Sequence, residues 1–156
     1  MKIVKTVLTA GLLLFVAASL ATPIVRHITA GRLGATTNAV PSRPDALVVY
    51  YFRSNVRCPA CRTLEACSHE VVSERFAAEA ADGRIEWRTV DYQTPGNEHF
   101  LTDYQLLTGG VVLVEFRDGR PTRWTALPET WNMTGDRKAL ARNLEEAIRT
   151  FQKERS

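Results

Sequence analysis

The sequence predicts an α/β protein, a small three-layer α/β/α sandwich with the order β-α-β-α-β-β-α, preceded by one N-terminal hydrophobic helix. Three observations predict it. The 156 residues have room for one domain and a leader, strand-like runs alternate with amphipathic segments, and a close cysteine pair follows the first strand. We divide the chain into a hydrophobic segment at 1–26, a flexible linker at 27–45, which lacks a hydrophobic period, and the α/β domain at 46–153.

The N-terminal segment has the composition of a membrane anchor. Lys2 and Lys5 precede residues 6–25, which carry no charge and are about as long as a helix that crosses a bilayer. The lysines favour a cytoplasmic N-terminus, so we expect the domain to be membrane-anchored on the extracytoplasmic, periplasmic side. Residues 19–21 (Ser-Leu-Ala) also fit a signal-peptidase site, and cleavage there would give a secreted protein. The uncharged run continues past this site to Val25, which favours the uncleaved anchor.

Four short runs predict the strands of the domain. Ala46–Phe52 is apolar on both faces, as in a central strand covered on two sides, and Arg84–Asp91 alternates in polarity. Val111–Arg117 is joined by the hairpin dipeptide Asp118-Gly119 to an antiparallel partner at 120–127. Because the first two crossovers each contain a helix, we expect both to join parallel strands.

Three amphipathic segments predict the helices. Residues 59–81 form the first, ended by Gly83; residues 97–107 form a shorter one with Asn97 as its N-cap; residues 136–152 form the last. The apolar residues of the three helices are Leu64, Cys67, Val71, Val72 and Phe76; Phe100, Leu101 and Tyr104; and Leu140, Leu144, Ala147, Ile148 and Phe151. We expect the tryptophans Trp87, Trp124 and Trp131 to be packing residues.

The candidate reactive centre is the motif Cys58-Pro59-Ala60-Cys61. Cys58 stands at the start of the first helix, where free N–H groups and the helix dipole stabilise a thiolate. Pro59 suits the first helical position, because its missing N–H costs nothing there. Cys61 lies one turn on and faces back toward Cys58, so the two sulfurs can bond without unwinding the helix.

Arginines surround this motif. Arg57 precedes Cys58, Arg62 follows Cys61 and Arg53 lies upstream, and their charge further favours a thiolate. We predict that Cys58 is the exposed nucleophile and Cys61 the more buried resolving thiol. The two would form a redox-active disulfide, with no other cofactor and no bound metal.

The same spacing also occurs in half of a structural zinc site, whose other ligands would have to come from elsewhere in the chain. Cys67 falls on the apolar stripe and is expected to be an inert core residue. We expect His69 to face solvent, and nothing brings His99 to the sulfurs. The alternative function is a non-enzymatic, soft-metal-binding or structural subunit of a membrane reductase complex. The formal net charge of +3 gives no electrostatic footprint for nucleic acid.

The strand VVYYF, the stretch from Arg57 to Arg62 and the later GGVVLVEFRDGR resemble proteins of the thioredoxin superfamily. Over about residues 46–127 the chain is similar to the membrane-anchored nitrophenyl-compound nitroreductase subunit ArsF family. The resemblance implies a thiol–disulfide oxidoreductase, a reductant or electron relay. It would work with a transmembrane electron carrier of the cytochrome-c-biogenesis type and with a disulfide or reductase partner. The family label implies reduction of nitroaromatic compounds, including organoarsenicals.

The chain departs from ordinary thioredoxins in three places. Arg57 replaces the tryptophan that leads the motif, and the first strand has no buried acid, so proton transfer to the resolving thiol would rely on water. The segment Thr108-Gly109-Gly110-Val111, which we expect to face the partner, lacks the cis-proline that keeps metals off the thiols and guides a partner's backbone. We expect its two glycines to leave space over the dithiol.

Overall fold

The computed structural model describes residues 41–154. The predicted hydrophobic segment at 1–26 and most of the predicted linker lie outside the described residues. Within 41–154, no helix is long and apolar enough to cross a membrane. The last linker residues lie on the domain, where the Ser42 amide donates to a Glu86 carboxylate at 2.6 Å and the Pro44 carbonyl accepts from the Gly119 amide at 2.9 Å.

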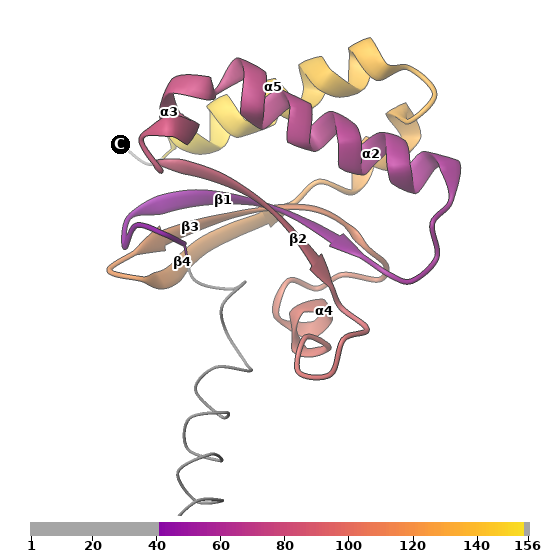
Figure 1. Cartoon of the computed structure of the whole chain (residues 1–156), viewed down its shortest axis with the longest axis horizontal. Helices are drawn as coiled ribbons and strands as arrows, with labels where there is room; N and C mark the ends of the chain where they lie inside the picture. Colours follow the sequence, from indigo (N-terminus) through magenta and orange to yellow (C-terminus); the bar gives the residue numbers. More distant parts are fainter. Residues whose placement is uncertain (1–40, 155–156) are drawn as a thin grey trace, which may run out of the picture. The chain divides into compact units, whose positions relative to one another are not determined.

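Four strands form one mixed sheet in the order β2-β1-β3-β4 (Figure 1). β1 pairs in parallel with β2 and antiparallel with β3, and β3 pairs antiparallel with β4. With helices on both faces, this sheet has the arrangement of a thioredoxin-like fold, and the predicted order of elements is confirmed. The strands are β1 (Ala46–Arg53), β2 (Ile85–Asp91), β3 (Gly110–Arg117) and β4 (Arg120–Ala126).

The second crossover differs from the prediction, because β3 runs antiparallel to β1 rather than parallel. The connection begins at Asp91, opposite Arg53 of β1, and ends at Gly110, opposite Phe52, so it starts and finishes at one end of the sheet. A parallel β3 would need a return along the sheet, about 26 Å for eight residues. The helix in this connection, α4 (His99–Asp103), is only about 7.5 Å long.

The first helix is interrupted, whereas the sequence predicted one helix over 59–81. It consists of α2 (Pro59–Glu70), a π-helical turn η1 (Val71–Arg75) and α3 (Ala77–Ala81). In a regular helix the twelve residue steps from Leu64 to Phe76 would turn Phe76 about 120° away from the apolar face. The wider π turn compensates, and Phe76 is fully buried.

The remaining helices also follow local signals. Asp136 caps α5 (Arg137–Lys153) by accepting from the amides of residues 138 and 139. Asn97 is not the N-cap of α4, which begins two residues later after Glu98. The Asn97 side chain instead donates to the Asp91 carbonyl at 2.9 Å and closes the turn after β2. A 3₁₀ turn, η2 (Pro128–Met133), joins β4 to α5.

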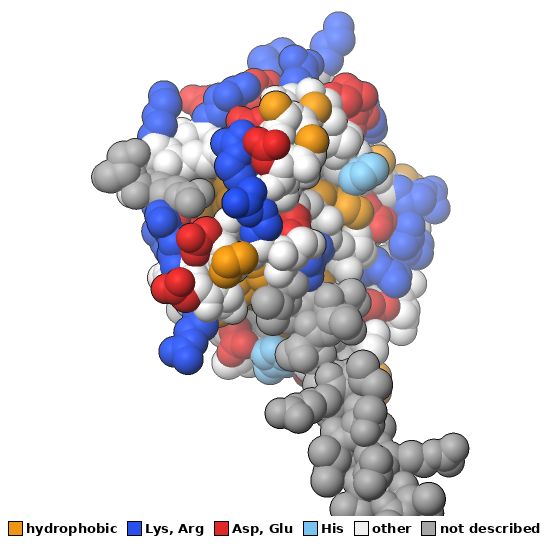
Figure 2. Space-filling model, turned by 60° about the vertical axis from the view of Figure 1, so that its left-hand side comes forward, with side chains coloured by type: hydrophobic (Ala, Val, Ile, Leu, Met, Phe, Trp, Pro, Cys, Tyr) orange, Lys and Arg blue, Asp and Glu red, His pale blue; other side chains and the backbone are white. Residues whose placement is uncertain are grey.

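The sheet has two apolar faces. α2, α3 and α5 cover one, and α4 lies on the other (Figure 1). β1 alternates between them: Leu47, Val49 and Tyr51 pack under α2 and α5, while Tyr50 and Phe52 pack with the aromatic residues of α4 and its C-cap. On the face that Figure 2 presents, basic and acidic side chains are interspersed. The double cover of β1 holds its carboxyl end, where the motif begins, in a fixed position.

Candidate functional site

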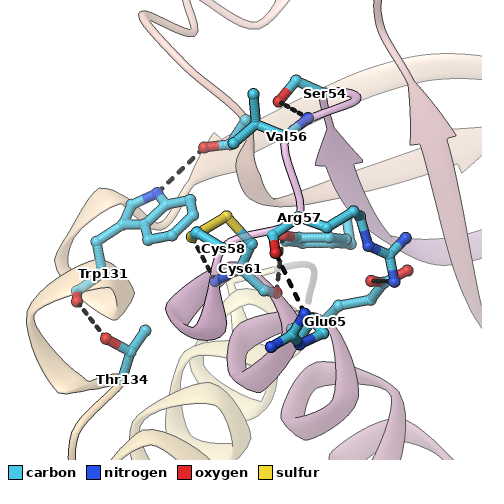
Figure 3. The surroundings of a disulfide bond; sticks show 11 residues. Ser54, Val56, Arg57, Cys58, Cys61, Glu65, Trp131 and Thr134 are labelled. Atoms are coloured by element: carbon cyan, nitrogen blue, oxygen red, sulfur yellow. Dashed lines mark hydrogen bonds and ion pairs between the residues drawn. A yellow bond between two sulfur atoms is a disulfide. The ribbon is translucent and has the colours of Figure 1, made fainter.

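The site is a disulfide between Cys58 and Cys61 at the N-terminus of α2 (Figure 3). β1 ends at Arg53, and a short loop carries the chain to Cys58, which is the N-cap of the helix. The backbone of Cys58 is extended (φ −68°, ψ 158°), and the helix begins at the next residue. Pro59 occupies the first helical position, which proline favours. The two Cα atoms lie 5.0 Å apart, as in other disulfides.

The first turn of α2 directs donors at the first sulfur. The Cys61 amide donates to Cys58 Sγ at 3.0 Å, so the sulfur fills the place of an N-cap oxygen. The Cys58 carbonyl accepts from the Arg62 amide at 3.1 Å, and Ala60 leaves the turn without a bulky side chain. Both cysteines are half-buried. The assignment of Cys58 as the more exposed thiol therefore stays a prediction.

The arginines around the motif are partly neutralised. Arg57 pairs with Glu65 at 3.1 Å, and Arg53 pairs with Asp91 at 3.6 Å. Arg62 uses its guanidinium to donate to the Arg57 carbonyl at 3.3 Å and stays exposed. Because two of the three positive charges face a carboxylate, their support for a thiolate is weaker than the sequence alone predicted.

Glu65 and Tyr51 are neighbours of the disulfide that the sequence reasoning missed. The buried Tyr51 hydroxyl donates to the Cys61 carbonyl at 2.9 Å and so ties β1 to the motif. Burial, with Glu65 nearby, raises the pKa of Tyr51 to about 12, which keeps the hydroxyl a donor at neutral pH. Glu65 lies one helical turn after Cys61. An acidic residue at that position, close in sequence to several arginines, was the sequence signal that could have revealed the ion pair.

Both glycines of the 108–111 segment have close neighbours, and the expectation that they leave space over the dithiol stays a prediction. A Cβ on Gly109 would stand 2.3 Å from the Phe52 carbonyl oxygen, so the residue is small because the β1 backbone passes there. A Cβ on Gly110 would stand 3.3 Å from Nε1 of Trp131. Val111 is buried in the core under α2, and Thr108 is exposed.

Trp131 packs against the core, as predicted, but the sequence reasoning missed its place beside the motif. It comes from η2, which contacts α2, and its indole lies beside the disulfide (Figure 3). Its N–H donates to the Gly109 carbonyl at 3.1 Å, and its own carbonyl accepts from the Thr134 hydroxyl at 3.1 Å. The chain therefore has an indole near the motif, although Arg57 stands where thioredoxins carry their tryptophan.

A mostly apolar pocket opens next to Trp131. Its volume is about 320 Å³, and residues of the 105–111 segment, the end of β4 and η2 line it, including Leu106, Leu107 and Pro128. The two exposed large hydrophobic residues of the described part of the chain, Val56 and Leu107, belong to the loop before Cys58 and to this pocket. Apolar surface is thus exposed near the motif.

The other candidate ligands do not join the two sulfurs. Cys67 is buried as expected, and burial raises the pKa of its thiol. His69 is exposed and lies against Trp87, with ring centroids 4.6 Å apart, while His99 pairs with Asp103. Among residues 41–154, no group of three or more His, Cys, Asp or Glu side chains is placed to hold a metal ion.

Comparisons with known proteins add little to this geometry. No protein-family model and no curated protein matches the chain. Among solved structures, a thioredoxin from Fasciola hepatica is similar over 62% of this chain and 80% of its own, with 20% sequence identity and a TM-score of 0.31. The strand order and strand directions of the sheet define the fold.

Proposed function

We propose that this protein is a thiol–disulfide oxidoreductase that works through Cys58 and Cys61. The observation that carries the proposal is the bond between these two sulfurs at the first turn of α2, with the Cys61 amide aimed at Cys58 Sγ. When the bond is reduced, that amide and the positive end of the helix dipole remain in place to stabilise a thiolate on Cys58.

The reaction consists of two exchanges. The Cys58 thiolate attacks one sulfur of a partner disulfide, which forms a mixed disulfide and releases the partner's other sulfur as a thiolate. The Cys61 thiol then loses its proton and attacks Cys58 Sγ, which re-forms the Cys58–Cys61 bond and releases the second partner thiolate. The partner gains two electrons, the pair loses two, and protons taken up from water complete the partner's thiols.

The helix geometry supports the nucleophile role of Cys58 and the resolving role of Cys61. Cys58 is the N-cap, so its sulfur lies outside the helical turn and receives an amide hydrogen bond. Cys61 lies inside the first turn, and its carbonyl is held by Tyr51. An incoming disulfide meets the N-cap sulfur first, and Cys61 is placed to attack that sulfur afterwards.

The surroundings favour a protein rather than a small disulfide as the partner. A partner whose disulfide reaches Cys58 must also cover the neighbouring surface, where Val56 and Leu107 expose apolar side chains. The pocket lined by Trp131 and the Thr108–Val111 segment could take an apolar side chain that flanks the partner's cysteine. We therefore propose that the Thr108–Val111 segment contacts the partner protein.

In the cell, we propose that electrons flow from this protein to its partner. The resemblance to the nitroreductase-subunit family and the predicted anchor support a periplasmic reductant or relay. A transmembrane carrier of the cytochrome-c-biogenesis type would recharge it, and the electrons would serve reduction of nitroaromatic or organoarsenical compounds. A reduction potential below that of the partner, and electron transfer from such a carrier in reconstituted vesicles, would support this direction.

Trapping of the mixed disulfide tests the proposal. The full chain with Cys61→Ser should form a covalent adduct with a disulfide-containing protein such as insulin, linked through Cys58. The Cys58→Ser variant should form markedly less. If neither variant is trapped, or if Cys61 is the linked residue, the proposed chemistry or the role assignment is wrong. Cys67 is present in both variants, so an adduct that forms equally in both would come from Cys67 and not from the motif.

A further inference from the structure

We propose that the Arg57–Glu65 ion pair sets the redox poise of the dithiol by withholding the charge of Arg57 from Cys58. The inference rests on the proposed function, because it concerns the same two sulfurs. Arg57 is bonded directly to Cys58 in the chain, and Glu65 stands one helical turn after Cys61. In Figure 3 the Arg57 side chain extends away from the disulfide, toward the Glu65 carboxylate.

Each partner of the pair makes a further contact. Arg57 Nη2 lies 3.1 Å from a Glu65 carboxylate oxygen, and the Arg57 carbonyl accepts from the Arg62 guanidinium. Glu65 is 20% exposed at its side chain and also accepts from the Thr89 hydroxyl at 3.5 Å. Contacts from the loop and from β2 thus hold one carboxylate against the arginine nearest to the nucleophile.

Other charges nearby do not replace this pair. Arg53 already faces Asp91 at the adjacent ends of β1 and β2. Tyr51 of β1 stays protonated at neutral pH, because burial raises its pKa to about 12. η2, which packs against α2, carries a single charged residue, Glu129. Arg62, whose guanidinium donates to the Arg57 carbonyl, keeps its charge in all the variants below, so the Arg57–Glu65 pair is where a single substitution either frees or removes a charge next to Cys58.

The electrostatic consequences have opposite signs for the two partners. Glu65→Gln removes a negative charge and frees the Arg57 cation, which should stabilise the Cys58 thiolate and lower its apparent pKa. The reduced form is then favoured, so the protein becomes more oxidising. Arg57→Gln removes the cation and leaves the carboxylate unpaired, so the apparent pKa should rise and the protein should become more reducing. The double variant should lie close to wild type.

Two measurements on the full chain report this effect. One is the pH profile of Cys58 alkylation by iodoacetamide after reduction, which needs no partner. The other is the equilibrium with glutathione, followed by mass spectrometry. Each single variant should move the equilibrium constant about threefold to tenfold, where tenfold corresponds to about 30 mV. Since the pair is partly exposed, high salt should shrink both shifts.

Glu70→Gln is the matched control, because Glu70 also lies on α2 and pairs with an arginine, Arg137, away from the motif. It should leave the alkylation profile unchanged, and Glu65→Asp should restore most of the wild-type profile. The inference is overturned if Glu65→Gln and Arg57→Gln shift the profile in the same direction, or if neither moves it. The variants could show these alkylation shifts while the wild-type protein never exchanges disulfides with a protein partner. That result would refute the proposed function and leave the inference standing.

Discussion

The indole N–H of Trp131 donates to the carbonyl oxygen of Gly109 at 3.1 Å, across 22 positions of sequence. The bond fastens the segment before β3 to η2, and η2 contacts the helix that carries the disulfide. The same indole also limits the next residue, because a Cβ on Gly110 would stand 3.3 Å from Nε1. Three segments remote in sequence are thereby held in one arrangement beside the sulfurs.

Trp131→Phe should lower the free energy of unfolding by about 1 kcal/mol or more, because one hydrogen bond is lost and the phenyl ring fills less space than the indole. It should also slow exchange with a protein disulfide but leave alkylation of Cys58 unchanged, since the sulfur itself is untouched. Urea denaturation and single-turnover exchange measure the two effects. Trp87→Phe is the control, because it loses a similar bond to the Ser68 hydroxyl (3.2 Å) further along α2. Equal slowing by both variants would contradict a local role for Trp131.

Gly109→Ala should destabilise the fold by about 1–3 kcal/mol or more, because its Cβ would stand 2.3 Å from the Phe52 carbonyl oxygen and backbone must move. Gly110→Ala should cost less, since the indole of Trp131 can shift by a few tenths of an ångström. Gly135→Ala, where nothing lies within 4 Å, is the reference. Urea midpoints that do not separate Gly109→Ala from Gly135→Ala would refute the close approach.

Tyr51→Phe should lower the free energy of unfolding by about 1 kcal/mol at neutral pH, because the Cys61 carbonyl loses its side-chain donor. Burial raises the pKa of Tyr51 to about 12, from about 10 in an unfolded chain. The protonated hydroxyl therefore contributes stability that is complete below the unfolded pKa and is lost as pH rises toward the folded one. Urea denaturation of both proteins should show the difference shrinking from neutral to alkaline pH. A constant difference would contradict the assignment.

Cys67 should react slowly with iodoacetamide in the folded protein, because its residue is only 1% exposed and burial raises the pKa of its thiol. In a Cys58→Ser/Cys61→Ser variant, labelling of Cys67 should be slow at neutral pH and fast in urea. Mass spectrometry over time measures both rates. Rapid labelling without denaturant would mean that this thiol is accessible, and that it competes with the motif for a disulfide.

Much of the fold could be predicted from sequence, because hydrophobic period and turn residues are local signals. Ala46–Phe52 is apolar on both faces, and the structure covers it on both. Asp118 and Gly119 both take positive φ values, as their hairpin turn requires. The direction of β3 could not be predicted from the presence of a helix, since it depends on whether α4 is long enough to return along the sheet.

The motif itself was also visible in the sequence, whereas its surroundings were not. Cys58 caps α2 because Pro59 and the apolar stripe that follows fix where the helix begins. Trp131 reaches the site through the hairpin and η2, a path that no local pattern describes. From the sequence, Arg57 and Arg62 were expected to place positive charge beside the motif. In the folded protein the Glu65 carboxylate, one helical turn after Cys61, pairs with Arg57.

The most direct test of the account is the redox equilibrium of the Cys58–Cys61 bond in the full chain. Mild oxidation should remove two hydrogen atoms from one molecule, dithiothreitol should restore them, and peptide mapping should locate the bond between these two cysteines alone. The equilibrium should be reversible in a glutathione buffer. Sulfurs that never couple to each other, even under strong oxidant, would contradict the central claim.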